Sequence, residues 1–454
     1  MSSSFTRATA TIDSLRRGLA ETSPFVKRGR ITRVTGLTLE AQLPAVFVGE
    51  LCVLEDAGAR GKVLAEVVGF RDSVTILMPL DPVEHVGMGA AVLATGRAFS
   101  LRLHEGYLGR VLDGLGQPLD GKPPPAAAEG QVYEVFREAP EPLERPRITQ
   151  PIGSGIKAID ALLTWGKGQR LGIFSGSGVG KSTLLGMVAR NSEADVNVLA
   201  LIGERGREVK EFIERDLREE GLAKSVVIVV TSNQSPVRRV KGALVAMTIA
   251  EYYRDQGKHV LFLMDSLTRY TYALREIGLA LGEPPTTRGY TPSVYAKIPQ
   301  LSERAGITET GSITALLTVL VEGDDINEPV ADIARSVLDG HIVLSRRLLA
   351  QGHVPPIDVR GSISRVFPDV TGTEQQKMAQ WVRETLTVYE EAEDLINIGA
   401  YKRGNNRRID AALDSIDMLK AFLVQQMDER WSREQSLAAL REIYEAAAAK
   451  AQGS

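Results

Sequence analysis

Apolar positions divide the chain into three regions that differ in periodicity. Over residues 25–95, short β-rich runs are separated by glycines, which predicts closely spaced strands in a small β-barrel or sandwich. Over 96–372, apolar runs of strand length alternate with helical stretches, which is typical of a parallel sheet covered on both faces. Over 373–454, apolar residues recur at intervals of three to four, which predicts a helical domain. The expected fold class is therefore an α/β core with a β-domain before it and helices after it.

The central region contains the strands on which the chemistry is expected to depend. The predicted strands are Arg170–Phe174, Val196–Ile202, Ser225–Thr231, His259–Met264 and Ser312–Val321. Before them, Gly, Pro and Asp residues cluster over 112–125, where we expect a loop-rich linker. Ligands of such sheets collect outside the carboxyl ends of the strands, so polar residues directly after these strands are the candidates for a site.

The first 24 residues carry a separate prediction. Ile12, Leu15 and Leu19 share one face of a predicted helix, whereas Arg16 and Arg17 fall elsewhere. This basic amphipathic segment either docks on a partner or packs as a chain end, and its residues alone leave both roles open.

Composition narrows the class of protein. The 54 Lys and Arg residues against 57 Asp and Glu give a net charge of −3, which supplies no general field for nucleic acid. The single Cys52 excludes an intramolecular disulfide, and no apolar run reaches the roughly 18 residues of a membrane span. Charged residues interrupt the first 20 positions, so no secretory signal is expected. These features predict a cytoplasmic protein.

A glycine-rich segment follows the predicted strand Arg170–Phe174 and precedes a helical run. Its residues are Gly176, Ser177, Gly178, Val179, Gly180, Lys181, Ser182 and Thr183. At a strand-to-helix junction, the backbone N–H groups of such a P-loop surround phosphate oxygens. We expect Lys181 to reach the β- and γ-phosphates of ATP and Ser182 to bind Mg²⁺. Ser175 stands where the motif usually begins with glycine, and an ordinary glycine-rich turn is the weaker alternative.

Two acidic residues come directly after predicted buried strands. Asp265 follows one of them, and we expect it to share Mg²⁺ with Ser182, although a helix N-cap is an alternative role. Glu204 follows another, and we expect it to act as the general base that polarises the attacking water. Arg205 would steady the γ-phosphate. Without a phosphate site nearby, this charged turn would be interpreted as a salt-bridged surface loop.

Several longer strings resemble those of one known family. They are Gly166–Arg170, Leu201–Val209, Asp265–Arg269, Arg275–Leu279, Gly282–Ser293 and Leu338–Arg346. Together with the P-loop they are similar, over nearly the whole chain, to the flagellar export ATPases and the ATPases of injectisome-type type III secretion. That family is related to the catalytic subunits of rotary ATP synthases. The resemblance implies a RecA-like P-loop core with an N-terminal β-barrel and a C-terminal helical domain.

The same resemblance implies a ring of six identical subunits with nucleotide sites at their interfaces. Arg365 matches the family's arginine finger, which reaches into the neighbouring site. Without the resemblance, a contact of Arg365 within its own domain would be the expectation. Val354 stands where relatives carry a Tyr that stacks on adenine, so apolar packing would replace stacking there. Tyr401 is the candidate for a second wall of that pocket.

In this family ATP hydrolysis energises protein export. The segment 1–24 would bind a regulatory stator-like protein, and the C-terminal domain would face the export gate and substrate–chaperone complexes. The protein would be cytoplasmic, peripheral to the inner membrane at the export apparatus, with no nucleic-acid partner. The string Pro284–Pro292 favours the flagellar branch over the injectisome branch. A rotary synthase subunit, a hexameric nucleic-acid translocase and a non-enzymatic nucleotide-binding scaffold are the remaining alternatives.

Overall fold

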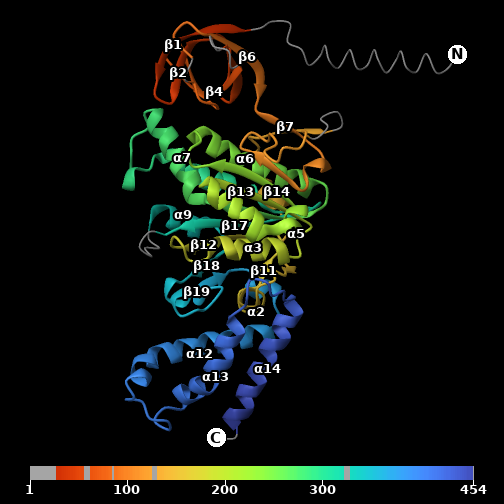
Figure 1. Ribbon diagram of the computed structural model, residues 1–454, viewed down its shortest axis with the longest axis vertical. Coiled ribbons are helices and arrows are strands. Elements are labelled where there is room, and N and C mark those ends of the chain that lie inside the picture. The colour runs from red at the N-terminus through yellow and green to blue at the C-terminus, as the bar shows by residue number, and fades with distance from the viewer. Residues whose placement is uncertain (1–26, 56–61, 84–85, 125–129, 322–327, 453–454) are drawn as a thin grey trace, which may run out of the picture. The chain divides into compact units, whose positions relative to one another are not determined.

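A computed structural model describes residues 27–55, 62–83, 86–124, 130–321 and 328–452 of the chain (Figure 1). The chain divides into two compact units, residues 1–100 with 280–282 and residues 101–279 with 283–454. The predicted amphipathic segment 1–24 lies outside the described residues. In the part of the chain that the structure describes, every helix is too short or too polar to cross a membrane.

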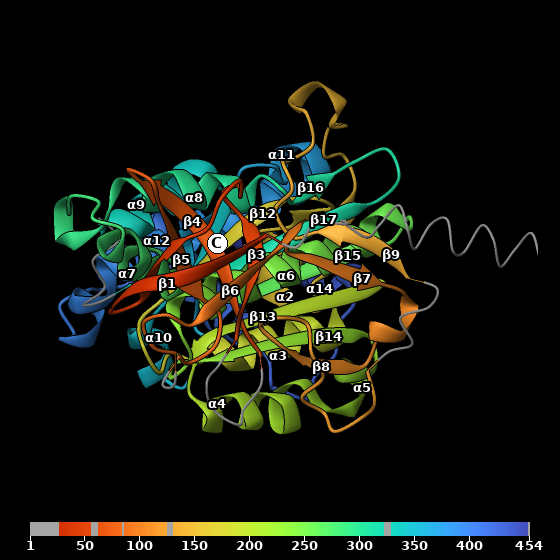
Figure 2. The ribbon, with the colours of Figure 1, turned by 90° about the horizontal axis from the view of Figure 1, so that it is seen from above.

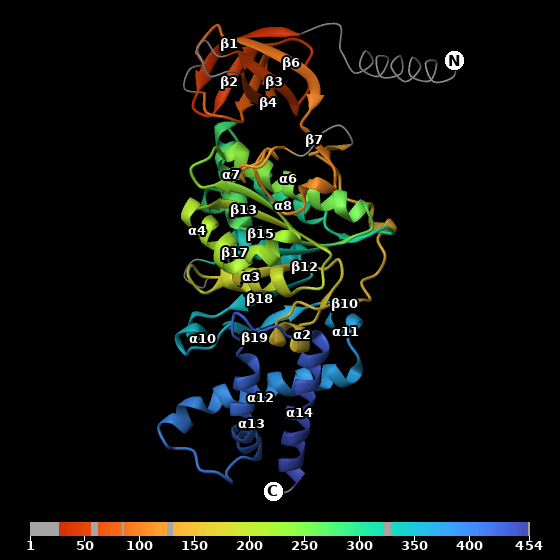
Figure 3. The ribbon, with the colours of Figure 1, turned by 45° about the vertical axis from the view of Figure 1, so that its right-hand side comes forward.

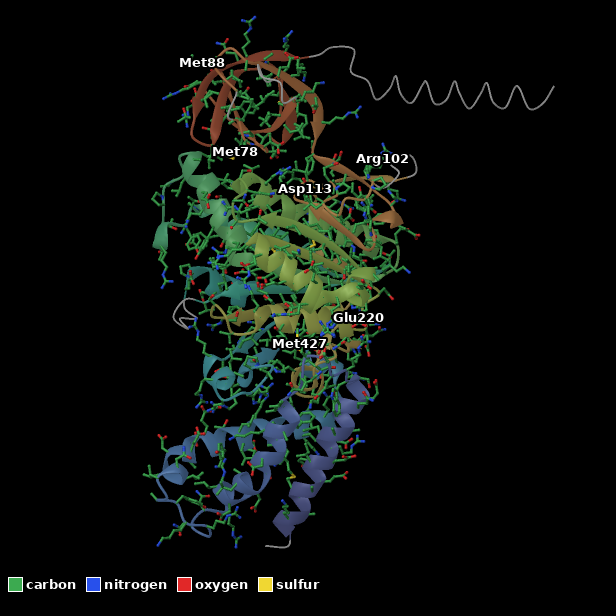
Figure 4. All side chains as sticks on the ribbon, viewed as in Figure 1. Met78, Met88, Arg102, Asp113, Glu220 and Met427 are labelled. Atoms are coloured by element: carbon green, nitrogen blue, oxygen red, sulfur yellow. The ribbon has the colours of Figure 1, made fainter. Side chains whose placement is uncertain are left out.

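The first unit contains a closed barrel with the strand order β1-β2-β5-β4-β3-β6. Its strands are β1 (Arg28–Thr35), β2 (Thr38–Gln42), β3 (Glu50–Glu55), β4 (Lys62–Arg71), β5 (Val74–Pro79) and β6 (Ala91–Ala98). In β3, the buried Cys52 and Leu54 alternate with half-buried neighbours, as expected of a strand with one face in a core. Side chains from all around the barrel fill its interior (Figure 4).

The second unit is built on one sheet with the order β19-β18-β12-β17-β15-β13-β14-β8, and β16 pairs with β17. The strands are β8 (Arg110–Asp113), β12 (Arg170–Ser175), β13 (Val196–Glu204), β14 (Ser225–Thr231), β15 (His259–Asp265), β16 (Gly306–Ile307), β17 (Ser312–Leu320), β18 (Gly340–Leu344) and β19 (Ile357–Ser364). The short strands β7 (Ser100–Leu103) and β9 (Gln131–Glu134) form a second pair, and β10 (Pro151–Ile152) and β11 (Trp165–Gly166) form a third. Strands β12, β13, β14, β15 and β17 coincide closely with the five predicted ones, and all pairs among them are parallel.

One element of this sheet was not predicted. The expected linker over 112–125 begins inside β8, which pairs in parallel with β14 at one edge of the sheet (Figure 2). The Arg110 guanidinium donates to the Asp120 carboxylate at 2.6 Å. An isolated antiparallel β-bridge joins Leu112 to Pro118. The glycine-rich segment therefore folds back on the strand. The linker prediction was therefore wrong for its first residues, because four residues of strand are too few to show a period.

Helices cover both faces of the sheet. They are α2 (Lys157–Leu162), α3 (Lys181–Asn191), α4 (Gly206–Glu211), α5 (Arg218–Ala223), α6 (Pro236–Asp255), α7 (Leu267–Ala280), α8 (Pro292–Ser302), α9 (Pro329–Val337) and α10 (Arg346–Ala350). Helix α6 packs on β13, β14 and β15, whereas α3 and α5 lie on the other side of the sheet (Figure 1). This two-sided cover explains why the strands are apolar along their whole length.

The chain ends in a group of helices that continues the core of the sheet. They are α11 (Phe367–Val370), α12 (Thr373–Asn397), α13 (Arg407–Leu423) and α14 (Arg433–Gln452). Helices α12, α13 and α14 pack on α2 (Figure 3), and Val382 and Leu419 belong to the same apolar cluster as the sheet. Arg190 of α3 joins the two regions, because it pairs with Glu220 and donates to the carbonyl of Met427, both labelled in Figure 4.

Candidate nucleotide-binding site

The P-loop lies between β12 and α3, where the sequence predicted it. Gly178 and Gly180 have φ angles of +75° and +85°, a backbone region that residues with a side chain rarely adopt. Gly180 begins the helix, because its carbonyl accepts a hydrogen bond from the Leu184 N–H at 3.1 Å. Among the described residues, no atom lies within 4 Å of a Cβ placed on Gly178. The loop therefore has the conformation and the open space that a phosphate cradle needs.

Three charged side chains meet beside this loop. Lys181 Nζ contacts Asp265 Oδ1 and lies 4.0 Å from Glu204 Oε1. The exposed fractions of the Lys181, Glu204 and Asp265 side chains are 12%, 16% and 6%. Glu204 and Asp265 are the last residues of β13 and β15, which are neighbouring strands. The structure thus brings together the predicted lysine and the two predicted carboxylates.

Thr318 supports this cluster and was not predicted from the sequence. Its hydroxyl donates to Asp265 Oδ1 at 2.9 Å, from strand β17 between β15 and β12. The bond fixes the Asp265 carboxylate beside the Lys181 ammonium. The available signal was a lone polar residue near the end of the apolar run of β17.

Arg269 is a second residue that the individual motifs did not identify. Gly203 has a φ of +76°, and a Cβ there would lie 2.8 Å from Arg269 Cβ, so only glycine allows this close approach next to Glu204. Within the described residues, Arg269 Nε is buried and has no hydrogen-bond partner. The half-buried Arg269 thus packs the aliphatic stem of its side chain against the residue that precedes the predicted base.

The environment of Glu204 suits a proton acceptor. Its pKa is raised to about 7, first because the carboxyl is buried and second because the Asp265 charge is close, while Lys181 acts in the opposite direction. A base works best when its pKa lies near the working pH. At neutral pH this carboxylate would exchange a proton readily, which an ordinary surface glutamate would not do.

Two side-chain oxygens beside the P-loop fit a magnesium ion. Among the described residues, no group of three or more His, Cys, Asp or Glu side chains could hold a metal alone. Mg²⁺ in nucleotide sites is typically held by one or two protein oxygens together with substrate phosphates and water. Ser182, exposed in the first turn of α3, and Asp265 provide such oxygens.

Two predicted arginines lie outside the cluster. The Arg205 side chain is 81% exposed and pairs with Glu208 at 3.3 Å, so it does not face Lys181 here. Arg365 is exposed, and its guanidinium donates to the carbonyl of Arg335 at 3.1 Å.

The register of the sheet shows how far Arg365 is from its own P-loop. Ser364, at the end of β19, pairs with Gly340 at the start of β18. Strand β18 runs parallel to β12, and its other end, Leu344, pairs with Ser175. Four steps of about 3.3 Å, or roughly 13 Å, separate Gly340 from Leu344. Arg365 therefore lies at the end of the sheet opposite to the P-loop of the same chain.

The structure places the two predicted adenine contacts in different parts of the molecule. Val354 lies in the loop whose Pro356 Cδ would be 3.9 Å from a Cβ on Gly180, so this loop adjoins the P-loop. The Val354 carbonyl accepts from Gln425 N–H at 2.8 Å, just beyond the end of α13.

Tyr401 precedes the first residue of α13, and its hydroxyl donates to Asp410 at 2.9 Å. The stretch of α13 from Asp410 to Leu423, roughly 20 Å at 1.5 Å per residue, separates this position from Val354. The structure therefore contradicts a second adenine wall at Tyr401, because the 25 residues of α12 carry the chain away from the loop before it returns.

Family models match three segments of the chain. The nucleotide-binding domain of the ATP synthase alpha/beta family matches residues 155–364, and the beta-barrel domain of that family matches 31–96. The C-terminal domain of the type III secretion ATPase EscN matches 371–442. These three segments correspond to the barrel, the sheet with its P-loop and the terminal helices.

Whole-chain relatives have names of two kinds. A flagellum-specific ATP synthase of Bacillus subtilis is 50% identical over 423 residues, which cover 93% of this chain and 96% of that protein. A second one, of Salmonella typhimurium, is 47% identical over 455 residues, 98% of this chain and 99% of that protein. A type 3 secretion system ATPase of Sinorhizobium fredii is 48% identical over 404 residues, 89% of each chain.

A solved structure extends the similarity to three dimensions. The assembled ATPase EscN of the type III secretion system of enteropathogenic E. coli matches with a TM-score of 0.85 and 41% identity, over 91% of this chain and 99% of that chain. The predicted fold class and family are therefore confirmed. The chain belongs to the ATP synthase alpha/beta family, among the ATPases that include the flagellum-specific ATP synthases and the type 3 secretion system ATPases.

Proposed function

We propose that this protein hydrolyses ATP to energise protein export by a bacterial flagellar, type III apparatus. Relatives named flagellum-specific ATP synthase, at 50% and 47% identity over nearly the full chain, support this choice. The observation that carries it is the contact of Lys181 with Asp265, with Glu204 at 4.0 Å, beside an open P-loop.

Each residue of the cluster has a chemical task in this proposal. The P-loop N–H groups and Lys181 bind the phosphate chain of ATP. The Lys181 ammonium, which contacts Asp265 in this structure, then contacts the phosphates instead. Ser182 and Asp265 would hold Mg²⁺, which supplies charge neutralisation on the phosphates when it is bound. Glu204 accepts the proton of the attacking water, for which its raised pKa is suited. Arg205 would turn from Glu208 toward the γ-phosphate once nucleotide is present.

The proposal includes a ring of six identical subunits with sites at the interfaces. Its support is the position of Arg365, exposed and at the far end of the sheet from its own P-loop. A guanidinium in that position can stabilise the charge of phosphoryl transfer if it reaches into the site of a neighbouring subunit. The solved relative is described as an assembled ATPase, and a second structure holds it with a central stalk protein.

The remaining partners follow from the family. The segment 1–24 would bind a regulatory stator-like protein, and the helices after Thr373 would face the export gate and substrate–chaperone complexes. The protein would work in the cytoplasm, at the inner face of the membrane but not in it. No nucleic-acid partner is proposed, because the net charge of −3 offers no general attraction to a polyanion.

Export by an injectisome is the second candidate. The type 3 secretion system ATPase of Sinorhizobium fredii, at 48% identity, is as similar as the flagellar relatives. Deleting the gene and restoring it distinguishes the two. We expect loss and recovery of flagellar assembly and motility; normal flagella with a loss of effector secretion would favour the injectisome.

The chemical part of the proposal is tested with two substitutions. We expect Lys181→Ala to weaken ATP binding about tenfold or more, because it removes a charge-assisted contact to phosphate. Glu204→Gln should keep ATP binding and lower turnover by about 10²–10⁴, because the amide cannot accept the proton. Calorimetric ATP titration and phosphate release measure the two effects.

Glu211→Gln is the matched control for these variants, because Glu211 lies on α4, pairs with Arg207 at 2.8 Å and is 46% exposed. It should behave as the unmodified protein. Undiminished turnover in Glu204→Gln would remove Glu204 as the base.

A further inference from the structure

Two consecutive arginines begin α10, directly after β18. The Ser345 hydroxyl caps this helix by accepting from Leu348 N–H at 3.4 Å. The Ser345 N–H in turn donates to the Pro356 carbonyl at 2.9 Å, which ties the start of α10 to the loop of Val354. The start of the helix is therefore held in place, and the directions of Arg346 and Arg347 are set by it.

The two side chains face different parts of the molecule. Arg347 pairs with Glu390 and, at 3.7 Å, with Glu393, both on α12. Arg346 faces the P-loop, because its Nε and one terminal nitrogen lie 2.6 Å from the position of a Cβ on Gly176. Consecutive helical residues differ by about 100° in direction, which allows this divergence. The absence of a side chain at Gly176 is what lets the guanidinium rest on the first turn of the loop.

Lys181 has carboxylate partners that balance its charge, whereas Arg346 has none among the described residues. Lys181 contacts Asp265, with Glu204 also close. In the described ranges of the chain, Arg346 forms no ion pair and donates no hydrogen bond from its guanidinium. A guanidinium matches phosphate oxygens in geometry and charge, and a phosphate held by the loop N–H groups would come within its reach.

We infer that Arg346 is a further substrate-binding residue, which donates hydrogen bonds to the phosphate chain of ATP at the start of the P-loop. The inference rests on the proposed function, because it takes the P-loop as the ATP site. Together with Pro356 near Gly180, Arg346 lets one segment contact both ends of the loop. The loop would then gain a second cation that is available without first releasing a carboxylate.

The test compares neighbouring arginines in the full-length protein. Arg346→Gln should weaken the binding of ATP, and of inorganic tripolyphosphate as a competitor, by about tenfold, because a charge-assisted contact is lost. The affinity should also depend less steeply on salt, which a purely structural effect would not produce. Arg347→Gln is the matched control, since it removes the same charge one residue away and faces α12; it should leave both affinities unchanged.

The outcomes of these titrations decide the inference. Equal affinities in Arg346→Gln and the unmodified protein would overturn it, and so would an equal loss in Arg347→Gln. If Arg346→Gln does not fold, Arg346→Lys against Arg347→Lys replaces it: a loss of a few-fold in the first alone supports the inference, and no difference overturns it. Lys181→Ala in the same titration distinguishes a failure of this inference from a failure of the proposed function. Full ATP binding by that variant would contradict the proposed ATP site itself.

Discussion

The two ends of the central sheet differ in whether the charged side chains of a single chain find partners there. At the P-loop end, Lys181, Glu204 and Asp265 are largely buried, and Lys181 Nζ contacts Asp265 and lies 4.0 Å from Glu204 Oε1. At the opposite end, Arg365 is exposed, and its guanidinium donates to the backbone carbonyl of Arg335. At the first end one chain brings three charged groups of the candidate site together. At the second end the Arg365 guanidinium is exposed to solvent.

This difference has a physical reason. A buried charge without a partner is costly, so Lys181 and Asp265 must compensate each other until nucleotide arrives. An exposed arginine has no such requirement, because water solvates it. Arg365 can therefore stay without an ion pair among the described residues of the single chain, and in the proposed ring it would contact the site of a neighbouring subunit. Head-to-tail contacts that close into a ring would bring the two ends together.

The largest expected effect comes from the exposed end. Arg365→Ala should lower turnover by about 10³–10⁵ while ATP binding changes little, because the guanidinium acts on charge that develops during phosphoryl transfer. Steady-state hydrolysis and an ATP titration measure the two quantities. Arg360→Ala, on the same strand but paired with Glu390, is the control and should keep turnover. A loss of turnover of less than about tenfold in Arg365→Ala would show that no finger acts there.

The buried end predicts a pH dependence. Since the pKa of Glu204 is raised to about 7, the group is protonated below that pH and cannot accept a proton from water. The turnover number at saturating ATP should therefore fall as the pH is lowered through about 7, approaching tenfold per pH unit. The profile should be measured from about pH 5.5 to about pH 8.5, with Glu204→Gln as the control that lacks this limb. A flat profile in the unmodified protein would argue that Glu204 is not the base.

The smallest effect concerns the loop that adjoins the P-loop. Val354→Tyr restores an aromatic ring beside the expected adenine position, and stacking should raise the preference for ATP over GTP by about two- to tenfold. Competition titrations with the two nucleotides measure this ratio. Val354→Leu changes volume without adding a π-face and should leave it unchanged. An unaltered ratio in the tyrosine variant would mean that adenine does not lie against residue 354.

The sheet and the half of the site that one chain assembles were accessible from the sequence. Runs of five to seven residues, almost all apolar, predicted β12, β13 and β15, since buried parallel strands need no polar alternation. Glu204 and Asp265 could be placed because each ends such a run, and parallel strands end at one edge. The P-loop was predictable because its glycines and lysine are contiguous.

The rest depended on contacts between distant segments. Thr318, Arg269 and Arg346 approach the site from β17, α7 and α10, and no local pattern marks the direction of a side chain. Strand β8 is too short to show a period, so its residues were assigned to a linker. Tyr401 was misplaced because the turn of a long helical hairpin can lie far from the loop that precedes it.

The comparison of the two ends is tested most directly by mixing two inactive variants. Lys181→Ala subunits lack the P-loop lysine and Arg365→Ala subunits lack the finger, so each alone should be inactive although both assemble. In rings formed from equal amounts, about a quarter of the interfaces would pair an intact Lys181 with an intact Arg365. We predict that hydrolysis returns in the mixture, up to about a quarter of the unmodified rate. Mixed rings that form but remain as inactive as the separate variants would contradict completion of the site by a neighbouring subunit.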